Sequence, residues 1–472
     1  MRALIYFGLT LLATVCQDIA VGQNRPNIVF ILADDLGYGD LGVYGQTKIE
    51  TPHIDRLAKN GLLFTDFYSG APVCAPSRSA LLTGQHTGHT YIRGNKEIQP
   101  EGQEPLAENV VTFAERLQQS GYQTGAFGKW GLGMVGTSGD PNRRGFDEFF
   151  GYNCQREAHR YYPNHLWHND QRIELEGNNT ADPQIYAPDL IQTRALAFIR
   201  AHSQEPFFLF VPTPLPHAEL VVPEDSLFQK YKGRFDETPF KGSDYGPGAP
   251  IGYSSQEQPR ATFAAMVARL DRHVGQLVET LEEEGILDNT IIIFTSDNGA
   301  HQEGGADPMY FQSSGNLRGY KRDLYEGGIR VPLIVHWPDR VDREQIVHHV
   351  AAFWDIGPTL LQLAQADSLP QSDGISFLPT LIGEAGQQTH PYLYWEFHEQ
   401  GGRQAVRIGD YKAVRMNALR GAEAPVELYH LPTDIGEQRD IAEAHPELVQ
   451  QAMEIMSAAR EEHPLFPFWP TY

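Results

Sequence analysis

The sequence predicts an α/β fold, in which a mostly parallel central sheet is sandwiched by helices and a small C-terminal α+β subdomain follows. Three observations predict this fold. Short apolar runs alternate with helical patterns through most of the 472 residues. No segment of about 20–50 residues recurs, and the pattern changes to alternating residues from about position 390. Continuous apolar strands separated by helices are typical of a parallel sheet covered on both faces.

The strands and helices of the main domain are predicted in turn from these patterns. Five short apolar runs are expected to be buried strands: residues 27–33, 123–127, 206–211, 290–295 and 331–336. Apolar residues at helical spacing predict four helices: residues 52–59, 109–119, 188–202 and 259–284. Thr51 is expected to cap the first helix. Long loops rich in Gly and Pro usually shape a site, and three are present: 131–145, 239–252 and 301–319.

The C-terminal part of the chain carries a different pattern. Alternating runs predict a small antiparallel sheet, and a helical pattern follows them. The runs are 392–398, 405–408, 411–416 and 427–431, and the helix is 446–462. We therefore expect a signal peptide at 1–22, a catalytic α/β domain at 23–389 and an α+β subdomain at 390–472.

The N-terminal residues have the composition of a signal peptide. Arg2 precedes an apolar core at 3–15 and small residues at 20–22, which predicts a periplasmic or extracellular protein. The core is too short to cross a bilayer and no later run approaches about 20 apolar residues, so no transmembrane segment is expected. Val15 before Cys16 is a poor match to a lipoprotein signal, so no lipid anchor is expected. The two remaining cysteines, Cys74 and Cys154, are too few for a disulfide framework.

The charge balance narrows the classes of partner. Lys and Arg number 37 against 60 Asp and Glu, which gives a net charge of −23. A surface this acidic repels phosphate backbones and anionic lipids, so no nucleic acid partner is expected. If the substrate is an anion, cations near the site must offset the repulsion that comes from the net negative charge of the protein.

Polar residues gather where the predicted strands end. Asp34 and Asp35 follow the first strand, and Asp297 and Asn298 follow the strand at 290–295. Ligands bind at the carboxyl ends of parallel strands, and these oxygen donors suit Ca²⁺ or Mg²⁺. Such pairs also occur in ordinary turns, but two strands that end in the same way favour a metal site. Further polar side chains lie near strand ends: Lys129, His217 and Lys321.

The second group of interest surrounds Cys74. Pro76 suits the first turn of a helix, which places Cys74 at a helix N-terminus. There the helix dipole and Arg78, one turn on, would favour a thiolate or another oxyanion. A buried structural cysteine is the alternative. The residues by themselves thus indicate a cysteine nucleophile beside a metal.

At these residues the sequence resembles the formylglycine-dependent (type I) sulfatases of the alkaline phosphatase superfamily, in particular bacterial arylsulfatase-like carbohydrate sulfatases. The signature is CAPSR at 74–78, followed by LTG at 82–84. Five more blocks occur in the family order: NIVFILADDLGYGD, GKWGLG, PLPHAEL, TSDNG and LRGYKRDLYEGGIRVP.

The resemblance implies a modified residue and a metal. A formylglycine-generating maturation enzyme would oxidise Cys74 to formylglycine, whose aldehyde hydrates to a diol. Ca²⁺, with Mg²⁺ as the second choice, would bind the diol and a sulfate oxygen. Its ligands would be Asp34, Asp35, Cys74, Asp297 and Asn298.

The resemblance also implies sulfate-ester hydrolysis and a role for each remaining residue. One diol hydroxyl attacks sulfur and expels the alcohol, and the other then collapses to the aldehyde and releases sulfate. Arg78 would stabilise the ionised diol, and Lys129 and Lys321 would neutralise sulfate oxygens. Lys321 or His217 would protonate the leaving oxygen. The tetrahedral, dianion-like transition state of this attack needs a metal and convergent cations. The expected substrate is an aryl sulfate or a sulfated glycan, with a sulfated sugar favoured.

Two other functions remain open from the sequence. The first is a phosphate or phosphonate ester hydrolase of the same superfamily, which usually has Thr or Ser as nucleophile and often two metals. Only one carboxylate cluster is evident here, and Cys74 holds the nucleophile position. The second is an inactive glycan-binding protein, although every expected charged ligand is present.

Two groups of aromatic and polar residues have no clear role in the sequence. The first favours a sugar platform, with a second metal site or a solvated loop as alternatives: His159, Tyr161, Tyr162, His165, Trp167 and His168. The second, at the start of the C-terminal subdomain, is ambiguous in the same way: Trp395, Glu396 and His398.

One position departs from the pattern of the resembled family. Many relatives have GKWHLG, whose histidine contacts a hydroxyl of the hydrated formylglycine, whereas this chain has Gly131. The missing imidazole would widen the pocket. We expect His89 or a water to replace the lost contact, and His86 to have a structural role.

Overall fold

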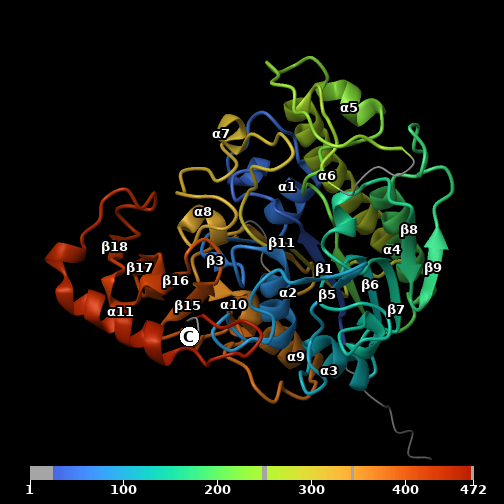
Figure 1. Ribbon diagram of the computed structural model, residues 1–472. Helices are drawn as coiled ribbons and strands as arrows, with labels where there is room; N and C mark the ends of the chain where they lie inside the picture. The colour runs from blue at the N-terminus through green and yellow to red at the C-terminus, as the bar shows by residue number, and fades with distance from the viewer. Residues whose placement is uncertain (1–24, 247–251, 342–344, 469–472) are drawn as a thin grey trace, which may run out of the picture.

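The computed structural model describes residues 25–246, 252–341 and 345–468 (Figure 1). The predicted signal peptide at 1–22 lies outside these residues. Within the described part of the chain, no helix combines the length and apolar character needed to cross a membrane.

A ten-stranded sheet forms the centre of the molecule and confirms the predicted fold class. Its five middle strands are parallel. In spatial order they are β11 (Thr290–Ser296), β1 (Asn27–Ala33), β10 (Phe207–Pro212), β6 (Gln123–Lys129) and β7 (Glu148–Tyr152). Ala33 lies opposite Ser296 and Leu32 opposite Pro212. The residues that follow β1, β10 and β11 therefore meet at one edge.

The outer strands are mixed in direction. β12, the fifth of the predicted strands, pairs with β11 in the antiparallel direction. The other four predicted strands are parallel to one another. Between β11 and β12 the chain forms only the four-residue helices α7 (Pro308–Phe311) and α8 (Glu326–Ile329), so it returns from the same edge instead of crossing the sheet. The sequence analysis missed most outer strands, which are short. The outer strands are β2 (Leu62–Phe64), β8 (His165–His168), β9 (Gln171–Glu174), β12 (Leu333–His336) and β13 (Gln345–Val347), and of these only β12 was predicted.

Helices cover both faces of the sheet. One face packs against α1 (Pro52–Lys59), α4 (Ala187–Ala201) and α6 (Pro259–Glu283), and the other against α2 (Cys74–Thr83), α3 (Phe113–Gln119) and α9 (Phe353–Ala364). Val29 and Ile31 enter the first core, whereas Ile28 and Phe30 enter the second. Because successive strand residues point to opposite faces, β1 must be apolar from Ile28 to Ala33, as the sequence predicted.

Local hydrogen bonds explain two differences between the structure and the sequence prediction at the starts of helices. α3 begins at Phe113 rather than at 109, because Thr112 and Glu115 form a reciprocal capping box. Thr51 stands at the N-cap position of α1 but makes no capping bond, so that prediction is wrong. Its hydroxyl instead donates to Asp55 at 3.0 Å and accepts from the backbone N–H of Gly42 at 2.9 Å.

The C-terminal part forms the predicted antiparallel sheet and helix, at the left of Figure 1. The elements are β15 (Leu393–Phe397), β16 (Arg403–Ile408), β17 (Tyr411–Met416), β18 (Val426–His430) and α11 (Pro446–Ala458). α11 packs on one face of this sheet. On the other face Trp395 packs against Tyr68 and Trp354, which fixes the sheet to the main body.

Candidate active site

The ends of β1 and β11 bring four oxygen-bearing side chains together, as the sequence predicted. The backbone N–H of Asp35 donates to Asp297 Oδ1 at 3.0 Å, and Asn298 Nδ2 donates to Asp35 Oδ1 at 2.7 Å. Asp34, like these three, is fully buried. Asp35 has a φ of +62°, a conformation that Asp tolerates better than most residues and that often marks functional sites.

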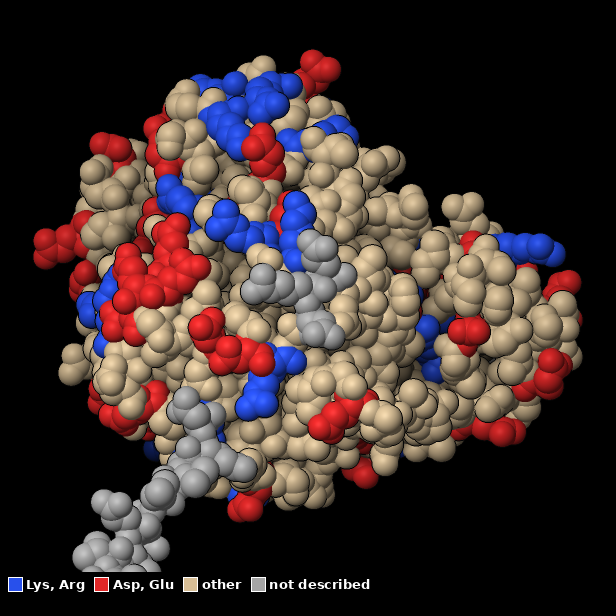
Figure 2. Space-filling view, turned by 180° about the vertical axis from the view of Figure 1, so that it is seen from behind, with Lys and Arg blue, Asp and Glu red and all other residues tan. Residues whose placement is uncertain are grey.

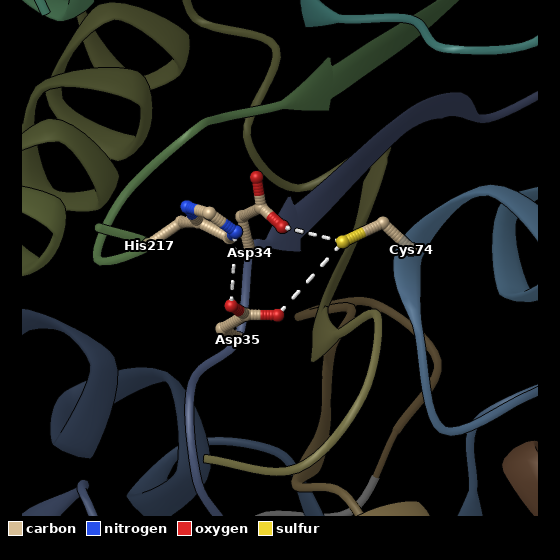
Figure 3. A group of neighbouring side chains, drawn as sticks. All are labelled: Asp34, Asp35, Cys74 and His217. Atoms are coloured by element: carbon tan, nitrogen blue, oxygen red, sulfur yellow. Dashed lines mark hydrogen bonds and ion pairs between the residues drawn. The ribbon is translucent and has the colours of Figure 1, made fainter. Parts of the chain in front are cut away.

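Cys74 is the first residue of α2 and points into this cluster (Figure 3). Its Sγ lies 3.4 Å from Asp34 Oδ1, 3.9 Å from Asp35 Oδ1 and 3.5 Å from Lys129 Nζ. The first turn of α2 is anchored to the end of β11, because Ser77 Oγ donates to the carbonyl oxygen of Asp297 at 2.6 Å.

Three buried cations surround the carboxylates. Lys129 Nζ donates to Asp34 Oδ2 at 2.6 Å, and Lys321 Nζ donates to Asp35 Oδ2 at 2.7 Å. Arg78 donates through Nη2 to Asp297 Oδ2 at 2.8 Å and through Nη1 to the carbonyl of Lys129. Lys129 is the last residue of β6, not a residue beyond a shorter strand. The three cations balance the charges of Asp34, Asp35 and Asp297.

His217 lies on the loop after β10, on the other side of Asp34 and Asp35 from Cys74 (Figure 3). Its Nδ1 contacts the carbonyl of Ala218, so this nitrogen carries the proton and Nε2 accepts. Nε2 lies 3.0 Å from Lys321 Nζ. The hydroxyl of Tyr161 lies within 2.8 Å of the carbonyl oxygens of Pro214 and His217 and supports this loop.

Burial and neighbouring charges decide the protonation states. Burial raises the pKa of Cys74 well above its ordinary value, with Lys129 opposing and Asp297 and Asp34 adding to the rise. The direction of this shift disfavours the expected Cys74 thiolate, and Arg78 is engaged by Asp297. Burial and Lys321 hold the pKa of His217 well below its ordinary value, so its ring is neutral.

The residues present fit a divalent cation of the oxygen-binding class. Asp34, Asp35 and Asp297 are carboxylates, and burial together with Asp34 raises the pKa of Asp297, which is expected where carboxylates share a site without an ion. Asn298 uses its Nδ2 for two hydrogen bonds, while its buried Oδ1 has no partner in the described structure. A hard cation matches this free amide oxygen and the three carboxylates.

Two residues that the sequence analysis did not assign to this site extend the cluster. Glu303 Oε2 accepts from Lys321 Nζ at 3.1 Å, and its other oxygen accepts from Arg322. The ring of His159 stacks on that of His217, with centroids 4.8 Å apart and an interplanar angle of 6°. Glu303 lies six residues after Asp297 in a loop that was predicted to shape a site, and this was the available signal. His159 was in a group expected to bind sugar.

The group around His159 does not form one platform. Tyr161 is buried beneath the site, whereas His165 and Trp167 lie on β8 and both bond to Glu101, at 2.8 and 2.7 Å. His168 lies 3.4 Å from Glu148 instead. Of these residues only His159 stacks on a predicted site residue, because β8 carries His165, Trp167 and His168 away from the site.

Glu396 in the second ambiguous group has structural contacts. Its buried carboxylate binds Arg93 at 3.3 Å, Arg460 at 2.8 Å and His398 at 2.9 Å. Trp395 is in the core between the two sheets. These contacts join the C-terminal sheet to the loop after α2 and to the C-terminal segment.

Gly131 does not open a wider pocket, contrary to expectation. A Cβ at this position would lie 1.9 Å from Nε2 of Gln155, so the amide of Gln155 already fills the space. His89 does not replace a side chain there either. It follows the far end of α2 and bonds to Asp373 at 2.9 Å, while His86 stacks on it. Cys74 begins this ten-residue helix, which is about 15 Å long. His89 therefore lies far from Cys74, and the expectation for His89 is wrong.

The surface outside the site mixes both signs of charge. Figure 2 shows acidic and basic side chains interspersed over the back of the molecule. Lys129, Arg78 and Lys321, by contrast, are at most 9% exposed. A protein with a net charge of −23 needs cations gathered at its site in order to bind an anionic substrate. These three buried side chains supply them.

Comparison with known proteins agrees with this geometry. Residues 26–366 match the sulfatase family model, and 318–462 match the C-terminal model of N-sulphoglucosamine sulphohydrolase. N-acetylgalactosamine-6-sulfatase of Canis lupus familiaris is 32% identical over 86% of this chain and 74% of its own. N-acetylgalactosamine-6-O-sulfatase of Bacteroides thetaiotaomicron is 28% identical, with 96% and 97% covered.

Solved structures show the same relationship. The structure of Ps i-CgsB in complex with k-i-k-neocarrahexaose superposes with a TM-score of 0.76 at 28% identity, over 92% of each chain. The phosphonate monoester hydrolase of Agrobacterium radiobacter has a TM-score of 0.66 at 19% identity, a likeness of fold alone. The family match covers most of the chain and includes every residue of the charged cluster. The chain therefore belongs to the sulfatase family and is a sulfuric ester hydrolase.

Proposed function

We propose that this protein hydrolyses the sulfate ester of a sulfated carbohydrate, with Cys74 converted to formylglycine and Ca²⁺ bound by Asp34, Asp35, Asp297 and Asn298. The observation that carries the proposal is the convergence of Cys74 with a set of oxygen donors and two lysines. Relatives named as N-acetylgalactosamine-6-sulfatases and the Ps i-CgsB complex with an oligosaccharide support a sugar substrate.

The modified residue and the ion would supply two elements of the chemistry. Formylglycine supplies a nucleophilic hydroxyl when hydrated, and the cation supplies positive charge beside the sulfate. The raised pKa of the unmodified thiol supports this proposal, because a neutral Cys74 is itself a poor nucleophile. Held by these residues, a divalent cation would shift the charge of the cluster from balanced to positive, as a bound anion requires.

The lysines would orient the sulfate and supply a proton. Although burial opposes their charge, Asp34 raises the pKa of Lys129 and Asp35 raises that of Lys321, so both are ammonium ions. Lys321 donates to the Nε2 of neutral His217. We therefore assign the proton for the leaving oxygen to Lys321, with His217 as the group that holds its ammonium in place. Arg78 would act indirectly, by fixing Asp297 and the backbone of Lys129.

Co-expression with a formylglycine-generating enzyme tests this function. We expect mass spectrometry of the Cys74 peptide to show aldehyde in place of thiol. Sulfate release from defined sulfated mono- and disaccharides should depend on that conversion. Cys74→Ala, which cannot be converted, is the matched control. Full activity from protein that carries only unmodified Cys74 would contradict the proposal.

A second comparison tests the chemical class. We expect matched nitrophenyl esters to show a higher kcat/KM for the sulfate than for the phosphate, and the reverse order would contradict a sulfatase. We also propose that 1–22 is removed as a signal peptide on export. N-terminal sequencing of the exported protein tests this cleavage, and a mature chain that still begins at Met1 would contradict it.

A further inference from the structure

Two buried carboxamides near Lys129 have no hydrogen-bond partner among the described residues. Asn153 is 0% exposed and Gln155 is 7% exposed, and neither the nitrogen nor the oxygen of either side-chain amide is bonded. Buried polar groups in folded proteins are nearly always paired. Two such amides so close in sequence therefore point to a partner from outside the chain, either a ligand group or an ordered water.

Backbone pairing places these two residues beside the edge of the sheet that holds the candidate active site. β6 and β7 are neighbouring parallel strands (Figure 1), and their pairing continues beyond the strand ends. The N–H of Trp130 donates to the carbonyl of Tyr152 at 2.9 Å, and that of Gly131 donates to the carbonyl of Asn153 at 3.0 Å. Asn153 and Gln155 thus leave the carboxyl end of β7 next to Lys129, whose Nζ lies 3.5 Å from Cys74.

Gly131 is required for the position of Gln155. A Cβ at 131 would lie 1.9 Å from Nε2 and 2.8 Å from Cδ of Gln155, and the φ of Gly131 is +79°. Only a residue without a side chain leaves room for this amide at this backbone conformation. Gly131 and Gln155 therefore form a matched pair.

The chemistry of the amides defines the class of ligand. Each carboxamide offers two donors and one acceptor and carries no charge. The charged sulfate oxygens are better served by Lys129 and Lys321, whereas a hydroxyl both donates and accepts and suits a neutral amide.

We propose that Asn153 and Gln155 form a subsite that hydrogen-bonds a hydroxyl group beside the bound sulfate, and that Gly131 keeps space for it. This inference rests on the proposed sulfate-ester hydrolysis. The hydroxyl belongs either to the substrate sugar or to the hydrated formylglycine, and the two sources are separable by choice of substrate.

The experiment uses the converted, metal-loaded enzyme and the variant Gln155→Met, which keeps the side-chain volume but removes the amide. We expect Tm to stay the same or rise, because an unpaired buried amide is lost, while kcat/KM falls about tenfold, as for one lost hydrogen bond. A fall with a sulfated monosaccharide but not with nitrophenyl sulfate assigns the hydroxyl to the sugar. An equal fall with both assigns it to the hydrated aldehyde.

Two further variants keep the test decisive. Gln192→Met removes a buried amide that is paired, since Nε2 of Gln192 donates to the carbonyl of His273 at 2.9 Å. It should lower Tm and leave kcat/KM unchanged. Gly131→Ala should displace the amide of Gln155 and lower kcat/KM. The double variant Gly131→Ala, Gln155→Met should lose no more kcat/KM than Gln155→Met alone.

The wild-type measurement separates failure of the proposed subsite from failure of the proposed function. Wild-type turnover with unchanged kcat/KM in Gln155→Met on both substrates would overturn the subsite, as would a lower Tm with normal activity per folded molecule. Absence of wild-type turnover on every sulfate ester would instead overturn the proposed function. In that case an unpaired amide still predicts no loss of Tm in Gln155→Met, and a lower Tm would overturn the subsite as well.

Discussion

Lys129 Nζ lies 2.6 Å from Asp34 Oδ2 and 3.5 Å from Cys74 Sγ, so the last residue of β6 reaches across β10 to the first residue beyond β1. This contact joins three segments that are far apart in the sequence. It also places an ammonium group beside the atom that the proposed modification would change.

Removal of this ammonium tests its role. We expect Lys129→Met to lower kcat/KM for a sulfate ester about 10²–10³-fold, because a fixed positive charge at the developing anion is lost. Steady-state kinetics of the converted enzyme measures this effect. Lys59→Met, on the exposed surface of α1, should leave the kinetics unchanged. Wild-type rates in Lys129→Met would contradict the assignment.

Metal binding is testable without turnover. In unconverted protein, Ca²⁺ should raise Tm because it relieves repulsion among the buried Asp34, Asp35 and Asp297. At a free ion concentration of 100 Kd the gain is about 2.7 kcal/mol. Asp297→Asn should reduce this gain, whereas the exposed Asp288→Asn should keep it. Scanning calorimetry with Ca²⁺ and with Mg²⁺ measures the preference, and no shift with either ion would contradict a metal site here.

The Glu396 network predicts a pH dependence of stability. Burial opposes the charge of Glu396, but His398, Arg460 and Arg93 hold its pKa at about 2, below the ordinary 4.5. Its contribution is therefore present above pH 4.5 and is lost as pH falls toward 2. Glu396→Gln should cost about 3–5 kcal/mol at pH 7, because Arg93 and Arg460 lose a buried carboxylate partner.

Thermal unfolding at several pH values measures this contribution. The difference in Tm between wild type and Glu396→Gln should shrink as pH falls from 4.5 toward 2. The exposed Glu384→Gln is the control and should differ little from wild type at any pH. A difference that stays constant or grows at low pH would show that the charge of Glu396 is not what stabilises the network.

His89 should be dispensable for catalysis. His89→Ala removes the bond to Asp373 and should cost about 0.5–1.5 kcal/mol of stability, while kcat stays unchanged because His89 lies at the far end of α2 from Cys74. Chemical denaturation and steady-state kinetics measure the two quantities. A large fall in kcat with native-like stability would restore a catalytic role.

Short-range patterns were sufficient for much of the fold. The apolar runs that became β1, β10 and β11 were recognisable because both of their faces are buried, so no polar residue interrupts them. The outer strands β2, β8, β9 and β13 were missed, because strands of three or four residues carry too little periodicity, and the five-residue β7 inside the sheet was missed as well. The direction of β12 was also missed, since it depends on where the preceding loop returns.

The sequence by itself determined that the oxygen-bearing side chains at the ends of β1 and β11 meet at the candidate site. Asp34 and Asp35, Asp297 and Asn298 follow directly on buried strands, and parallel strands align their carboxyl ends, so their convergence follows from local pattern and topology. What only the tertiary structure decided were the contacts between loops. The stacking of His159 on His217, the distance of His89 from Cys74, and the filling of the space beside Gly131 by Gln155 all depend on loop paths. These paths are fixed by packing and backbone pairing between segments distant in sequence, which no local pattern encodes.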